Sequence, residues 1–410
     1  MTNGAVVAAV GGSVQPGWER VRDAFARGQA HDPGAAQLAV HHHGRLVVDL
    51  WTTGTAAPPD GRPFGPDRIG VLMSVSKAMV AVCAHVLCER GVLDLDAPVA
   101  RYWPEFAAQG KVDTQVADLL AHRAGLPAFT DDPAGVGMPG HLDWEARVSA
   151  LAAMRPVWVP GSAYLYHSLT YGHLVGEVIR RVSGVSVGSF FSREVAGPLG
   201  LDLWIGLPER MEHRFVPQFA VRDAPTAEQV VTAIADLGLS PDGRLAGALR
   251  ASVAELDAVI DALRTRQGRA CELPAAGGIG NARSLSRLYA ALIGRVDGVR
   301  LLSSATLDRA RAPHTDHLPQ PAPLDRLDGP DRSRFGLGFE LPRPGEPLLG
   351  EGSLGHAGAG GQLGMAHPES GLAVGYVCTA MSWEPSSGPD PRWAQWTAAV
   401  REAAGIPARN

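Results

Sequence analysis

Residues 74–90, which read SVSKAMVAVCAHVLCER, contain the strongest structural signal in the chain. Their apolar residues recur every three to four positions, which predicts a helix with a buried face, and Gly91 follows as its C-terminal cap. Residues three apart on a helix are neighbours, so the amine of Lys77 can reach the hydroxyl of Ser74. A serine hydroxyl needs a base to take its proton, and a desolvated lysine can serve as that base. The alternative is an unreactive serine and lysine at the start of a surface helix.

The scarcity of lysine favours the chemical interpretation of this motif. The chain has 37 basic residues, of which only Lys77 and Lys111 are lysines. Arginine supplies surface charge equally well, but it does not lose its proton near neutral pH. A lysine retained in this background is therefore a candidate for proton transfer.

Length and charge exclude several other classes of protein. A chain of 410 residues is expected to form two or three packing units, and its net charge of −5 offers no positive field for nucleic acid. The apolar run at 5–10 is short and has no basic residues before it, so it does not match a secretory signal. No apolar segment is long enough to span a membrane. We therefore expect a cytoplasmic protein that binds neither nucleic acid nor membrane. The four cysteines, Cys83, Cys88, Cys271 and Cys378, are expected to be free thiols, because even the two that lie five apart lack the CxxC spacing of zinc or redox sites.

Strand patterns occur near both ends of the chain. Residues 37–41 and 45–51 predict a hairpin, and residues 335–341, 361–367 and 372–381 predict later strands. Helical patterns dominate between them, most clearly at 171–182, and a helix is expected at 392–403. This order predicts an α/β domain from residues 1–72 and 331–410, with a mostly helical domain at 73–330. The active site is expected between the two domains.

Several motifs along the chain resemble those of the class C β-lactamase-related serine hydrolases, which include the family VIII carboxylesterases. The resemblance is carried by the Ser74 to Lys77 motif and by three later segments, RGVLDLDAPV at 90–99, YWPEF at 102–106 and LLAHRAGLP at 119–127. It extends over nearly the whole chain. It implies the β-lactamase and penicillin-binding-protein fold, in which an antiparallel sheet is built from both termini and a helical domain is inserted.

The other two motifs of that family also occur, in the family's order. Tyr166-His167-Ser168 resembles the Tyr-x-Asn or Tyr-x-Ser motif, and His356-Ala357-Gly358 resembles a variant of Lys-Thr-Gly. The resemblance implies that Ser74, Lys77 and Tyr166 are catalytic. Residues expected to contact substrate are Ser168, His356, Ala357 and Gly358. It also implies an oxyanion hole from the backbone N–H groups of Ser74 and Ala359, and no metal or organic cofactor.

The proton-transfer roles can be stated from the chemistry of the side chains. Tyr166 becomes a useful proton acceptor only when a cation lies close, and Lys77 would be that cation. The two groups are therefore expected to share one proton.

Two departures from the antibiotic-destroying members favour ester hydrolysis. His356 replaces a lysine that supports recognition of the β-lactam carboxylate, and Ser168 replaces an asparagine. His356 is expected to be neutral at pH 7 and partly protonated toward pH 6. A small-molecule acyl ester is therefore the expected substrate. An acyltransferase with the same residues is the alternative, a β-lactamase or D-peptidase is disfavoured, and a non-catalytic acyl-binding sensor is disfavoured most.

Three further patterns are expected to be structural. Residues 184–188 match the GxSxG motif of α/β-hydrolases, but a helix precedes them where that motif needs a strand, so Ser186 is expected in a capping turn. The histidines at 41–43 are expected at the end of a hairpin strand, since neighbouring strand residues point to opposite faces. His122 is expected to be a hydrogen-bonded core histidine.

Overall fold

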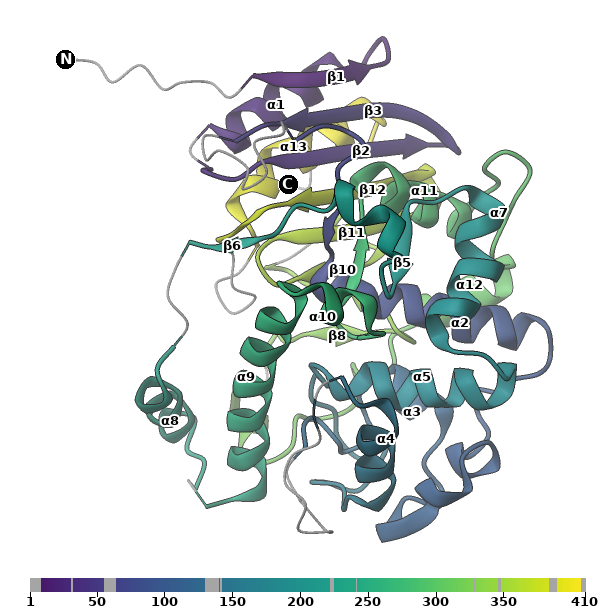
Figure 1. Ribbon diagram of the computed structural model, residues 1–410, viewed down its shortest axis with the longest axis vertical. Helices are drawn as coiled ribbons and strands as arrows, with labels where there is room; N and C mark the ends of the chain where they lie inside the picture. The colour runs from purple at the N-terminus through teal and green to yellow at the C-terminus, as the bar shows by residue number, and fades with distance from the viewer. Residues whose placement is uncertain are drawn as a thin grey trace.

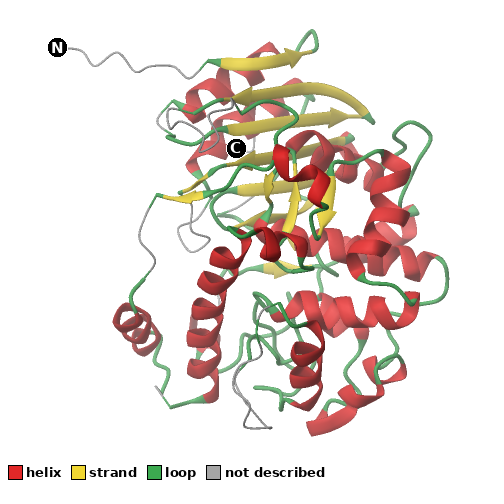
Figure 2. Ribbon diagram, in the orientation of Figure 1, coloured by secondary structure: helices red, strands yellow, loops and turns green. Residues whose placement is uncertain are grey.

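A computed structural model describes residues 9–30, 32–54, 64–129, 140, 142–221, 225–240, 242–327, 329–345, 348–382 and 389–406. Its main element is an eight-stranded antiparallel sheet (Figures 1 and 2). In spatial order the strands are β1 (Val10–Val14), β3 (Arg45–Thr52), β2 (Ala36–His42), β12 (Leu372–Cys378), β11 (Gln362–His367), β10 (Leu354–Gly358), β9 (Glu340–Leu341) and β8 (Arg334–Phe335).

The sheet joins the two ends of the chain, as the sequence predicted. β2 pairs with β12 over seven residues, with Leu38 opposite Tyr376 and Val40 opposite Val374. The predicted hairpin is confirmed as β2 and β3. Strands 330 residues apart in sequence therefore form the centre of the sheet, which is the antiparallel sheet from both termini that the resemblance implied.

Helices cover both faces of this sheet. On one face, α1 (Glu19–Gln29) and α13 (Pro391–Ala403) pack together and bury side chains such as Phe25 and Trp396 against Leu38 and Val40. On the opposite face, α11 (Ala282–Ile293) packs on β2, β11 and β12. α11 belongs to the segment 73–330 and still lies on the sheet. The predicted domain boundaries stay a prediction.

The other helices lie mostly below the sheet in Figures 1 and 2, with α7 and α12 to its right. They are α2 (Ser76–Glu89), α3 (Val116–Leu120), α4 (Trp144–Ala153), α5 (Thr170–Ser183), α6 (Val187–Phe191), α7 (Gly197–Leu199), α8 (Ala227–Asp236), α9 (Arg244–Leu263), α10 (Arg266–Ala270) and α12 (Ser304–Arg311). α2 is buried on all sides from Ser76 to Leu87 rather than on one face. It begins two residues later than predicted, because Met73–Val75 form a 3₁₀ turn before it.

Two of the predicted late strands are interrupted. Residues 335–341 form β8 and β9, because the intervening chain turns, with Gly336 N–H bonded to Phe339 O at 2.9 Å. Residues 372–381 form β12 and β13 (Ala380–Met381), and β13 leaves the main sheet to pair with β6 (Phe219–Ala220). A third sheet has the order β4 (Gly70–Val71), β7 (Gly278–Gly280) and β5 (Leu203–Ile205).

Candidate active site

Ser74 lies in the 3₁₀ turn that leads into α2, and the end of β10 lies directly beside this turn. A Cβ atom on Gly358 would lie 2.5 Å from the carbonyl oxygen of Leu72, so only glycine allows this approach. Met73, the residue before Ser74, has a φ of 48°, which is strained for a residue with a side chain. Ser74 is thus presented on a tightly held and strained turn at the edge of the β10 strand.

Lys77 is fully buried on the first turn of α2. Its Nζ atom donates hydrogen bonds to Ser74 Oγ at 3.1 Å and to the carbonyl of Ala275 at 2.9 Å. Burial lowers the pKa of Lys77 to about 7, with the nearby Glu340 acting in the opposite direction. A substantial fraction of the amine is therefore neutral near pH 7 and can accept a proton from Ser74.

The second lysine has a different role. Lys111 donates to the carbonyls of Ala108 at 2.8 Å and Ala152 at 3.0 Å, and also to that of Met154. It therefore satisfies carbonyl groups at the end of α4. Only one of the two lysines lies beside a nucleophile.

Tyr166 lies in the loop before α5, and the side chain of Ser74 is close enough to favour its phenolate. Lys77 Nζ lies 4.9 Å from the centroid of the tyrosine ring, which also packs against Phe335 and His122. Burial raises the pKa of Tyr166 well above its usual value. Lys77 is thus the nearby cation that was expected, and the sharing of one proton between Lys77 and Tyr166 stays a prediction, while desolvation of the phenolate favours the protonated form of Tyr166. Tyr166 is a neutral phenol beside Ser74.

The third motif is on β10, facing the same site. His356 is buried, and its Nδ1 lies 2.7 Å from the carbonyl of Ala357. Burial and the nearby Lys77 lower the pKa of His356 to about 3. The residue is neutral at pH 7 as predicted, but the expected partial protonation toward pH 6 is wrong, because a buried imidazolium beside Lys77 is unfavourable.

The turn that carries Ala359 follows β10, whose residues contact the 3₁₀ turn of Ser74. Ala359 is the second residue of a turn closed by the 3.0 Å hydrogen bond from Gly361 N–H to Gly358 O, with Gly360 at a φ of 86°. Within the described part of the chain, neither Ser74 N–H nor Ala359 N–H donates to another residue. The oxyanion hole that the resemblance implies, from Ser74 N–H and Ala359 N–H, stays a prediction.

Glu340 is a site residue that the sequence did not reveal. It lies on β9 opposite Gly355, and its Oε2 accepts a 2.8 Å hydrogen bond from Ala357 N–H. Its Oε1 lies 3.6 Å from His356 Nδ1. Burial raises the pKa of Glu340 to about 7, with the Ala357 N–H, Arg343 and Lys77 opposing this effect. An acidic side chain thus lies beside the third motif, next to His356.

This geometry agrees with comparisons to known proteins. The Beta-lactamase family model matches residues 21–398. The chain belongs to the Beta-lactamase family.

Relatives of this Beta-lactamase family chain include esterases, and more distant ones include beta-lactamases. The esterase/beta-lactamase LipL of Mycobacterium tuberculosis is 33% identical over 352 residues, which cover 84% of this chain and 76% of LipL. A family VIII carboxylesterase structure has a TM-score of 0.76 at 32% identity, covering 96% of this chain and all of the other. EstA of Arthrobacter nitroguajacolicus has a TM-score of 0.79 at 30% identity, covering 96% and 99%. The chain is a serine hydrolase, and the predicted resemblance is confirmed.

The structure also shows where the other residues singled out in the sequence of this Beta-lactamase family chain lie. Ser168 is half-buried two residues after Tyr166, and its expected contact with substrate stays a prediction. Ser186 caps α6 by accepting a hydrogen bond from Ser189 N–H, so the expected capping turn is confirmed. His122 is buried and accepts a 3.1 Å hydrogen bond from His167 N–H, which confirms a core histidine.

The histidines at 41–43 lie at the end of β2, as predicted, and His41 Nδ1 is 2.9 Å from Ser286 Oγ. The described residues hold no group of three His, Cys, Asp or Glu side chains suited to a metal ion. All four cysteines are free, as predicted.

None of the described helices is long and apolar enough to cross a bilayer. Most of the apolar run at 5–10 lies outside the described residues.

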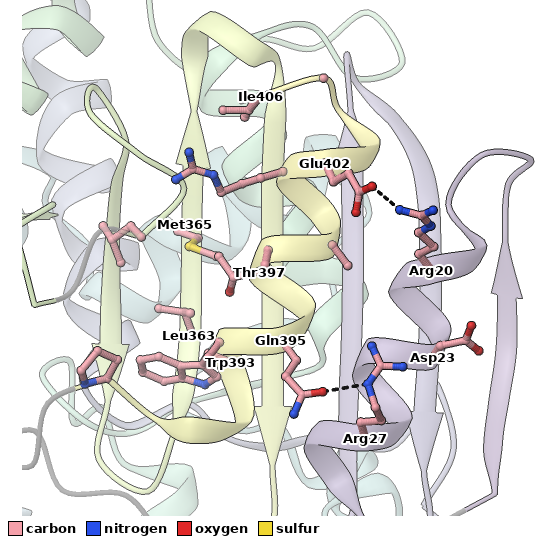
Figure 3. Close-up of a pocket in the computed structure, with 17 residues that line it drawn as sticks. Arg20, Asp23, Arg27, Leu363, Met365, Trp393, Gln395, Thr397, Glu402 and Ile406 are labelled. Carbon is pink, nitrogen blue, oxygen red and sulfur yellow. Dashed lines mark hydrogen bonds and ion pairs between the residues drawn. The ribbon is translucent and has the colours of Figure 1, made fainter. Parts of the chain in front are cut away.

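A large groove of about 1180 Å³ lies elsewhere, between α1 and α13 on the sheet (Figure 3). Its lining includes Arg20, Leu363 and Trp393, but none of the residues proposed for catalysis. The active site is therefore assigned from the side chains around Ser74, and not from the size of this groove.

Proposed function

We propose that this serine hydrolase is a carboxylesterase acting on small neutral esters. The observation that carries the proposal is the buried Lys77 amine 3.1 Å from Ser74 Oγ, with a pKa lowered to about 7. The esterase relatives described above add support for the substrate class.

In the proposed reaction, Ser74 Oγ attacks the ester carbonyl carbon while neutral Lys77 takes the hydroxyl proton. The tetrahedral oxyanion is bound by Ser74 N–H and Ala359 N–H. Tyr166, which lies beside Lys77 and Ser74, passes a proton to the departing alkoxide and regains one from the Lys77 ammonium. Breaking the carbon–oxygen bond of the leaving group produces an acyl-enzyme on Ser74. Water then attacks this ester by the reverse proton path.

The charges around β10 support neutral substrates. His356 is uncharged, and the nearby Glu340 carboxylate would repel an anion. A penicillin carries a carboxylate, whereas a simple ester does not. The proposal therefore places penicillins and cephalosporins among slow substrates or weak inhibitors.

The test is steady-state hydrolysis of p-nitrophenyl acetate, butyrate and octanoate, with product analysis in the presence and absence of alcohol and amine acceptors. We expect free acid as the main product. Acyl transfer in preference to hydrolysis would instead favour the acyltransferase alternative. Failure of a fluorophosphonate to label Ser74 would favour a non-catalytic acyl-binding protein.

His356→Lys is expected to shift selectivity toward penicillins. A charge-assisted hydrogen bond to the substrate carboxylate contributes roughly 1.5 to 3 kcal/mol, or about 10- to 150-fold. We expect the ratio of kcat/KM for benzylpenicillin to that for p-nitrophenyl butyrate to rise by this factor at pH 7.5. His317→Lys, on another segment of the chain, serves as the matched control. A wild type that already prefers benzylpenicillin would contradict this account of substrate class.

Glu340→Gln is expected to remove a pH dependence from the same ratio. Because the pKa of Glu340 is raised to about 7, its negative charge is present above that pH and lost below it. Removing repulsion across roughly 8 Å at an effective dielectric constant of roughly 40 is worth about 1 kcal/mol, or roughly fivefold. The wild-type ratio should therefore rise about fivefold from pH 8.5 to 5.5, and the ratio in Glu340→Gln should be high and flat. Any shared loss of Lys77 base function cancels in the ratio. An unchanged slope in Glu340→Gln would assign the pH dependence to another group.

A further inference from the structure

A buried ion cluster lies behind the turn that carries Ala359. Arg392, on the first turn of α13, contacts two carboxylates, Asp32 at 2.5 Å and Asp390 at 2.5 Å. The side chains of these three residues are between 1% and 6% exposed. A buried ion cluster of this kind is weak evidence for stability, because desolvation offsets the attraction between the charges. Its contacts with the backbone indicate another role.

Arg392 is hydrogen bonded to the oxyanion turn itself. Its Nη2 donates to the carbonyl of Gly360 at 2.5 Å, and its Nη1 donates to that of Ala380 at 3.2 Å. The next residue of α13, Trp393, donates from Nε1 to the carbonyl of Gly361 at 3.1 Å. Figure 3 shows Trp393 extending from the start of α13 toward Leu363 on β11. Two consecutive side chains thus hold the two carbonyls that follow Ala359.

The guanidinium is itself held in one orientation. Asp390 Oδ1 caps α13 by accepting from Arg392 N–H at 2.9 Å, and it also accepts from Arg392 Nε at 3.0 Å. Asp32 Oδ1 accepts from Gly34 N–H at 2.7 Å, which fixes that carboxylate to the chain before β2. A Cβ atom on Gly361 would lie 1.9 Å from Arg392 Nη2, so the turn and the guanidinium are in close contact.

We propose that Arg392, oriented by Asp32 and Asp390, is a positioning residue that aims the Ala359 N–H at the developing oxyanion. Arg392 touches no reacting atom. It fixes the peptides that follow Ala359, and the 3.0 Å bond from Gly361 N–H to Gly358 O transmits this order to the peptide that contains the Ala359 N–H. Helix α13, on the far side of the sheet from α11, is thereby part of the catalytic architecture. The inference rests on the proposed role of Ser74 and on the oxyanion hole.

The test compares Arg392→Met with Arg147→Met. Arg147 forms a buried ion pair with Glu255 in the helical half of the molecule, away from this turn, so its loss controls for destabilisation. The primary readout is the second-order rate constant for labelling of Ser74 by a fluorophosphonate, which needs the oxyanion hole and does not depend on the ester chosen. The second readout is the Ki of an alkyl boronic acid, which mimics the tetrahedral intermediate.

We expect Arg392→Met to lose about 10² in labelling rate and in boronic acid affinity, in the range seen when one oxyanion donor is removed. KM for p-nitrophenyl butyrate should change less than threefold, and Arg147→Met should keep all three values within threefold of wild type. Trp393→Phe removes one hydrogen bond while keeping a ring, and we expect it to lose about fivefold with the fold intact. Trp393→Phe also provides the test if Arg392→Met does not fold.

Labelling and boronic acid affinity within threefold of wild type in both Arg392→Met and Trp393→Phe would overturn the inference. If Arg392→Met does not fold, the Trp393→Phe result alone decides. Absence of ester hydrolysis by the wild type would overturn only the proposed substrate class, because fluorophosphonate labelling still reports on the oxyanion hole.

Discussion

Ser74→Ala is expected to reduce ester turnover by about 10⁴- to 10⁶-fold, as loss of a serine nucleophile does in other hydrolases. The variant keeps Lys77 and Tyr166 in place but has no atom to form the acyl bond. Ser186→Ala should retain most of its activity, because Ser186 is the capping residue of α6 and its hydroxyl is bonded to Glu272 at 2.5 Å. The measurement is kcat/KM for p-nitrophenyl butyrate, with thermal unfolding to verify that both variants fold. An inactive, folded Ser186→Ala beside an active Ser74→Ala would invalidate the assignment.

Lys77→Arg is expected to lose at least about 10² in kcat although the positive charge is retained. Arginine stays protonated and cannot accept the Ser74 proton. In the wild type, kcat/KM should fall as the pH drops below about 7, because Lys77 then becomes protonated. Lys111→Arg is the matched control, because Lys111 only donates hydrogen bonds to carbonyls. Near-normal rates in Lys77→Arg would mean that Lys77 acts as a fixed charge.

The sequence predicted the parts of the site that depend on local spacing. Ser74 and Lys77 are neighbours because they are three residues apart at the start of a helix, and the rarity of lysine drew attention to the pair. Glu340 could not be found in this way. It reaches the site through the pairing of the two-residue strand β9 with β10, and no motif surrounds it in the sequence.

The protonation states of the site residues also could not be predicted from the sequence. The pKa of Tyr166 is raised mainly because burial desolvates the phenolate, and the sequence alone does not show this burial. The same holds for His356, whose identity predicts a group that titrates near pH 6 but whose burial keeps it neutral. The Arg392 cluster could not be predicted from the sequence either. Its members come from α13 and from the chain before β2, which are about 360 residues apart.

The most direct test of the account is to locate the acyl group on the protein. The enzyme is mixed with p-nitrophenyl butyrate, quenched in acid within milliseconds, digested and analysed by peptide mass spectrometry. The account predicts a butyryl group on the peptide containing Ser74 in the wild type and its absence in Ser74→Ala, while Ser186→Ala is still acylated on Ser74. A butyryl group on Ser186, or rapid turnover by Ser74→Ala, would contradict it.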